Sequence, residues 1–165
     1  MAWQDEMGIM LRVMVSDNGT TQTYSDDDIE NSICLAARLV QMKADFPVSY
    51  AVNVENATIV PDPTVGDNRD ENFINLVCLQ GACVLDRGSA LRAAGQAIMI
   101  RDGSSQIDLR DTFKAKLALI EKGWCAVYAE TLDDYLVNQK GTTVGAAILT
   151  PFRIYANDYA MRYYR

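Results

Sequence analysis

The sequence contains no histidine, and this absence removes several kinds of active site. Catalytic triads of serine or cysteine rely on an imidazole as the general base, and many zinc sites rely on it as a ligand. The stretch RDGSS at residues 101–105 also fails to match the GxxxxGK[ST] pattern of a phosphate-binding loop. We therefore predict no catalytic residues, no metal site and no cofactor, and a protein that is not an enzyme.

Long apolar runs are missing as well. No stretch approaches the roughly 20 apolar residues that are needed to cross a bilayer. The N-terminal MAWQDEMG has no basic region ahead of an apolar one, which a secretory signal would require. We expect a soluble intracellular protein with no membrane segment and no removed signal.

The four cysteines do not form a CxxC pair; they are Cys34, Cys78, Cys83 and Cys125. Each lies within an apolar helical pattern, and the five-residue step between Cys78 and Cys83 places them on different sides of a helix. Small buried thiols in a reducing compartment are favoured over zinc ligands or disulfides.

The chain is acidic, with a net charge of −7 over 165 residues, and this length is typical of one domain. Such a surface repels phosphates, so nucleic-acid binding is not the default expectation. The charge is uneven, because residues 152–165 contain three arginines and only one aspartate.

The most regular helical pattern spans residues 111–140. Large apolar side chains recur there at steps of three and four, at Phe113, Leu117, Ile120, Trp124, Val127, Tyr128, Leu132 and Tyr135. Gly141 stands where a C-cap glycine is expected. We predict one long helix that forms the spine of the domain. Its acidic residues spread around the exposed side and do not converge on a site; they are Glu121, Glu130, Asp133 and Asp134.

Ser25 marks the clearest helix start in the chain. Three aspartates fill the first turn, where the helix dipole favours negative charge, and Asp28 completes a short-armed capping box. Capping is favoured over a cation site, because the interleaved oxygen ligands of a calcium loop are missing. Pro47 is expected to end this helix. Its expected buried face is Ile29, Ile33, Ala36, Ala37, Val40 and Ala44.

Two further helices are expected, at residues 3–15 and at residues 71–95, the second capped by Asp70. Gly81 in the second helix invites close approach by another helix. The apolar face of that helix is expected to be Phe73, Leu76, Val77, Cys83, Val84 and Leu91. Alternating apolar residues predict β-hairpins at 48–60 and 98–108, with an exposed loop after the first.

These patterns together predict a mainly α fold. We expect a small helical bundle with a long central helix, one or two short β-hairpins and an extended C-terminal arm. Residues 1–151, including the hairpin at 48–60, would form the helical domain, and residues 152–165 would form the arm.

The C-terminal arm holds four of the eight tyrosines and three arginines. Both residue types are enriched at the energetic centres of protein interfaces, so the arm is predicted to dock on a partner. The predicted docking residues are Phe152, Arg153, Tyr155, Tyr159, Arg162, Tyr163, Tyr164 and Arg165. Two alternatives stay open: packing of the evenly spaced tyrosines on the spine helix, and nucleic-acid contact by arginines and aromatic rings.

The order of elements resembles the head–tail connector (adaptor) proteins of tailed bacteriophages, which form the ring beneath the portal. The likeness runs from Ser25 to the C-terminus. Three stretches carry it: YSDDDIENSICLAARLV at 24–40, DENFINLVCLQGACVLDRGSALRAAGQAIMIRDG at 70–103, and IDLRDTFKAKLALIEKGWCAVYAE at 107–130.

The resemblance implies a homo-oligomeric ring of twelve subunits around the DNA channel, at the neck of the virion, with the subunit made in the host cytoplasm. Residues 142–165 would dock on the portal protein, and further neck or tail proteins would bind below the ring. DNA would slide through an acidic channel without specific binding. The candidate channel residues are Asp62, Asp67 and Asp70.

Two hypotheses from other classes remain. One is a small acidic regulatory adaptor inside the cell that binds a protein partner through the same C-terminal arm. The other is a small helical enzyme. Oligomeric state separates the first from a connector, and a convergent polar pocket with a buried carboxylate would favour the second.

Overall fold

The computed structural model describes residues 2–66, 69–95, 99–102, 105–108 and 122–143. The chain divides into two compact units, Met1–Asp133 and Asp134–Arg165. The described residues are mainly helical, with two short antiparallel hairpins, which confirms the predicted fold class. The boundary predicted between residues 151 and 152 lies outside the described residues.

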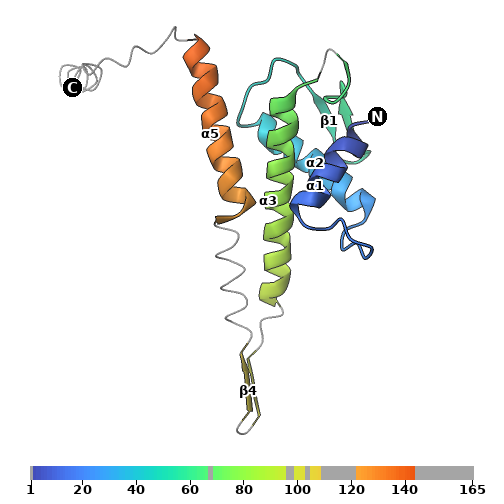
Figure 1. Cartoon of the computed structure of the whole chain (residues 1–165), viewed down its shortest axis with the longest axis vertical. Helices are drawn as coiled ribbons and strands as arrows, with labels where there is room; N and C mark the ends of the chain where they lie inside the picture. The colour runs from blue at the N-terminus through green and yellow to red at the C-terminus, as the bar shows by residue number, and fades with distance from the viewer. Residues whose placement is uncertain (1, 67–68, 96–98, 103–104, 109–121, 144–165) are drawn as a thin grey trace, which may run out of the picture. The chain divides into compact units, whose positions relative to one another are not determined.

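Helices α1 (Trp3–Met14) and α2 (Asp26–Gln41) form one layer of the first unit (Figure 1). The Ser25 capping box is present, because its side chain accepts from the Asp28 N–H and the Asp28 carboxylate accepts from the Ser25 N–H. All six residues predicted for the buried face of α2 are buried. The helix ends at Gln41 and not at Pro47, since the N–H groups of Lys43 and Ala44 both turn back to the Val40 carbonyl.

The centre of the core is α3 (Glu71–Gly95), which packs against α1 and α2. Every residue from Leu76 to Cys83 is buried, so this helix is covered on all sides over two turns. Its last turns differ: Leu91, predicted to face the core, is 74% exposed. Among the described residues, α3 is the central helix of the core. The long helix predicted over residues 111–140 lies partly outside the described residues, which resume at residue 122.

The first hairpin pairs β1 (Ala51–Asn53) with β2 (Thr58–Val60), in the register Val52 opposite Ile59. An aromatic cluster joins this region to α3. The Tyr50 ring stacks on the Phe73 ring with centroids 4.0 Å apart. The Phe46 ring contacts the Phe73 ring edge-on, with centroids 5.1 Å apart. These aromatic contacts add to the burial of the apolar surface.

The second predicted hairpin is present as β3 (Met99–Asp102) paired with β4 (Ser105–Asp108), with Ile100 opposite Ile107. The last described helix, α5 (Trp124–Thr143), corrects the prediction of an unbroken helix over 111–140. A bend at Gly123 precedes it, and the Gly123 carbonyl accepts from the N–H groups of Ala126 and Val127. Gly141 lies inside α5, so it is not the C-cap. Residues 109–121 lie outside the described part of the chain.

Candidate functional site

The predicted docking arm lies outside the described residues, as does Asp67. The roles assigned to residues 152–165 therefore remain predictions. The surfaces that the structure does describe belong to the first unit and are built on α1, α2 and α3.

Asp62 and Asp70, the other two candidate channel residues, both have partners within the fold. One Asp62 carboxylate oxygen accepts from the Trp3 N–H at 3.1 Å, and the other accepts from the N–H and hydroxyl of Thr64 at 2.9 and 2.7 Å. Asp70 caps α3 as predicted, accepting from the Phe73 N–H at 3.0 Å. These contacts give both carboxylates a structural function, and the channel role remains a prediction.

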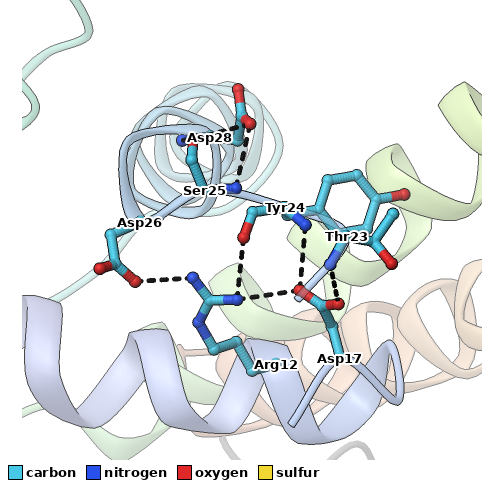
Figure 2. A network of polar contacts seen from close by, with 7 residues as sticks. All are labelled: Arg12, Asp17, Thr23, Tyr24, Ser25, Asp26 and Asp28. Carbon is cyan, nitrogen blue, oxygen red and sulfur yellow. Dashed lines mark hydrogen bonds and ion pairs between the residues drawn. The ribbon is translucent and has the colours of Figure 1, made fainter. Parts of the chain in front are cut away.

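A buried ion pair joins the end of α1 to the loop before α2 (Figure 2). The Arg12 guanidinium donates to the Asp17 carboxylate at 2.9 Å, to the Tyr24 carbonyl at 3.1 Å and to the Asp26 carboxylate at 2.6 Å. The side chains of Arg12 and Asp17 are only 11% and 4% exposed. Three acceptors around one guanidinium satisfy its buried charge, so the network orders residues 15–25 and the start of α2.

Hydrogen bonds to the Asp17 carboxylate lower its pKa. The Thr23 N–H at 2.6 Å makes the largest contribution, the Tyr24 N–H at 3.2 Å adds to it, and the charge of Arg12 acts in the same direction. The pKa of Asp28 is lowered as well, first by its bond with the Ser25 hydroxyl. Hydrogen bonds from neighbouring backbone and hydroxyl groups consequently favour the charged forms of both carboxylates.

An acidic groove lies between α1 and α2, with a cavity of about 270 Å³. It is lined by Gln4, Asp5, Gly8, Ile9, Arg12, Asp26, Ile29 and Glu30. Ile29 and Gly8 are buried at its base, while Ile9 is 64% exposed. Burial raises the pKa of the Glu30 carboxyl, and the charges of Asp27, Asp26 and Asp5 raise it further. The groove thus joins an apolar base to an excess of negative charge.

A second groove, of about 370 Å³, lies between the start of α2 and the last turns of α3. The Arg92 guanidinium stands 5.6 Å from the centroid of the Tyr24 ring and 3.4 Å from its hydroxyl. Neutral polar groups supply much of the remaining lining, including Thr23, Asn31 and Ser32. Since Arg92 is engaged by the tyrosine and lies near Asp28, this groove has no concentrated charge of one sign.

The opposite end of α2 carries positive charge around an exposed apolar side chain. Met42 follows the helix and is 82% exposed, the largest value among the exposed large apolar residues of the described chain. Arg38 and Lys43 flank it and are both exposed. The Lys43 ammonium is 5.2 Å from the centroid of the Tyr128 ring. We call Arg38, Met42 and Lys43 the basic end of α2.

The interpretation of all four cysteines as thiols is wrong for two of them. Cys83 of α3 and Cys125 of α5 form a disulfide, with Cα atoms 4.7 Å apart. Cys34 and Cys78 are free and buried, as expected. Burial raises the pKa of the Cys34 thiol to about 11 and that of Cys78 to about 12. The separation of 42 residues hid the pairing, because both cysteines lie on apolar faces and their meeting depends on how two helices pack.

Within the described residues, no group of three or more cysteine, aspartate and glutamate side chains is placed to hold a metal ion. None of the described helices is long and apolar enough to span a membrane. Comparisons with protein-family models, with curated proteins and with solved structures found no match.

Neither the Arg12 network nor the groove between α1 and α2 was predicted from the sequence. Arg12 lies within the methionine-rich stripe of α1. A charged residue at such a core-facing position indicates a buried ion pair, and this was the sequence feature that could have predicted the network. The groove had no local signal, because Asp5 and Glu30 come together only when α1 packs on α2.

Proposed function

We propose that this chain is a head–tail connector subunit of a tailed bacteriophage, which assembles into a ring between the portal and the tail. The order of its parts carries the proposal. Amphipathic helices interrupted by a hairpin come first, then a long helical segment of which the structure describes α5, then an apolar segment and a tail rich in tyrosine and arginine. This is the order of elements on which the resemblance to connector proteins rests.

In this proposal the two ends of the chain have different tasks. The described core of the first unit forms the body of the ring, stabilised by α3 and by the Arg12 network. Residues 152–165 dock on the portal protein through aromatic and arginine side chains. A net charge of −7 favours passage of DNA over its retention, because like charges repel across a channel.

The composition of phage particles tests this function. DNA-filled particles are sedimented from infected cells that make the protein, and the chain is quantified by mass spectrometry against the portal protein. The expected result is co-sedimentation with near-equal copy numbers of the two proteins. A chain that stays in the supernatant with one small protein partner would overturn the connector proposal and favour the regulatory adaptor.

A second measurement distinguishes formation of the ring from docking on the portal. The chain is produced alone and with the portal protein, and both samples are imaged by electron microscopy. Rings with an open centre, stacked on portal rings in the second sample, are expected. Portal rings that carry no added density would contradict the docking step.

A further inference from the structure

Helix α2 carries opposite charges at its two ends. Its first turn holds Asp26 and Asp27, with Glu30 one turn further along, and the basic end holds Arg38 and Lys43. The sixteen-residue helix is about 24 Å long, and even its nearest opposite charges, Glu30 and Arg38, are about 12 Å apart along the axis, beyond the screening length of about 8 Å at physiological salt. The same helix therefore presents an acidic surface and a basic surface on one molecule.

Each of these surfaces also has an apolar centre. The acidic groove has Ile29 and Gly8 at its base and the exposed Ile9 on its wall. A Cβ at Gly8 would lie 3.9 Å from Ile29 Cγ2, so the absent side chain leaves the groove open at this point. The basic end has the unbranched side chain of Met42, which adapts readily to an irregular apolar recess.

We propose that the acidic groove of one copy binds the basic end of α2 of a second copy. Met42 enters the groove beside Ile9 and Ile29, and Arg38 and Lys43 pair with Asp5 and Glu30 at its rim. The inference rests on the proposed function, because it supplies the contact between neighbouring subunits of the ring.

The two halves of this contact are different surfaces, so the association is head-to-tail. A head-to-tail contact repeats from subunit to subunit, and it closes into a ring when the rotation between neighbours permits. Electrostatic complementarity selects the partner and speeds its approach, while burial of Met42 slows dissociation. Because the paired charges lie at the rim, added salt is expected to weaken the association.

Charge reversal on each half tests the contact in the full chain. Glu30→Lys places a cation in the acidic groove, and Arg38→Glu places a carboxylate at the basic end. Each variant alone is expected to weaken association about tenfold or more, as measured by sedimentation velocity, because like charges then oppose each other. Glu55→Lys and Arg87→Glu, exposed charges elsewhere in the first unit, serve as matched controls and should assemble like the unchanged chain.

Mixing the two variants gives the sharper result. The reversed groove faces the reversed basic end, and the two unreversed halves also face each other, so an equal mixture should recover the assembly that each variant lost. Recovery also shows that both variants are folded. A mixture that stays dissociated, or single variants that assemble normally, would overturn the inference.

The apolar part of the contact, made by Met42, is tested separately. Met42→Ser is expected to weaken association, while Leu91→Ser, which removes a comparably exposed apolar side chain from α3, should not. If the unchanged chain forms rings and Met42→Ser forms them equally well, the contact lies elsewhere and the connector proposal stands. If the unchanged chain neither self-associates nor joins phage particles, both proposals fail together.

Discussion

Gly81 of α3 lies directly against Leu11 of α1. A Cβ built on Gly81 would be 3.3 Å from one Leu11 methyl carbon, 3.4 Å from the other and 3.8 Å from the Ala36 Cβ of α2. The three helices of the first unit therefore meet closely around one residue that has no side chain. The sequence predicted this close approach at Gly81, and the structure confirms it.

A larger side chain at Gly81 should destabilise the fold. Gly81→Ile would force Leu11 and the adjoining helices apart, and we expect it to lower the free energy of unfolding by about 1–3 kcal/mol. Gly88→Ala is the matched control, because nothing lies within 4 Å of a Cβ at that position of the same helix. It should raise stability by up to about 1 kcal/mol through helix propensity alone. Chemical denaturation measures both, and equal effects would contradict the close packing.

Acid should remove the contribution of Asp17 to stability. The pKa of Asp17 is lowered in the folded chain. Its charge therefore stabilises the fold above the unfolded pKa, which is about 4. That contribution is lost as the pH falls through this value towards the folded pKa. Asp17→Asn should therefore have a lower Tm at neutral pH and lose less of it on acidification.

Thermal melts between neutral and strongly acidic pH check this expectation. Asp133→Asn, at an exposed position on α5, is the matched control and should leave the melting profile close to that of the unchanged chain. Parallel profiles for Asp17→Asn and the unchanged protein would show that the Arg12 network does not govern the acid response.

The free thiols should be unreactive until the protein unfolds. Burial raises the pKa of Cys34 to about 11 and that of Cys78 to about 12, so neither is a thiolate at about pH 8. A chromogenic thiol reagent should detect no rapidly reacting group in the native chain, two thiols in denaturant, and four after reduction. Detection of four thiols in denaturant without a reductant would exclude the disulfide.

The disulfide should contribute measurably to stability. Joining residues 42 apart restricts the unfolded chain, and its loss should cost about 2–4 kcal/mol. The paired substitution Cys83→Ser with Cys125→Ser, compared with the unchanged chain by chemical denaturation, measures this cost. Agreement between the variant and the reduced unchanged protein would assign the effect to the bond.

Removal of residues 152–165 should separate docking from folding. We expect the truncated chain to keep its helicity and its Tm, because the described core is built by α1, α2 and α3, and to lose binding to the portal protein. Circular dichroism and co-purification with the portal protein provide the two readouts. A large fall in Tm would show that the arm belongs to the core, which was the open alternative.

Local chemistry made parts of this fold predictable. The Ser25 capping box, the Asp70 cap and both hairpins depend on residues close together in the chain, and all four are present as predicted. The buried face of α2 followed from its spacing, because that helix packs against both α1 and α3.

The predictions that failed depended on distant parts of the chain. The segment 111–140 has a wide apolar stripe, yet Val127 in it is 39% exposed, since spacing does not identify the surface that other helices cover. The α2 helix ended before Pro47 because backbone bonds to Val40 closed it earlier. The meeting of Cys83 with Cys125, and of Asp5 with Glu30, required the packing of whole helices.

The Cys83–Cys125 bond also turns part of the chain into a closed covalent loop. The loop holds every residue from 84 to 124, including the hairpin of β3 and β4. One peptide bond cut anywhere in that span leaves a single molecule, because the two pieces stay linked through sulfur. Such a nicked chain would migrate intact in a gel without reductant and as two fragments with it. A protease that cleaves the chain within the hairpin would consequently release nothing from the protein.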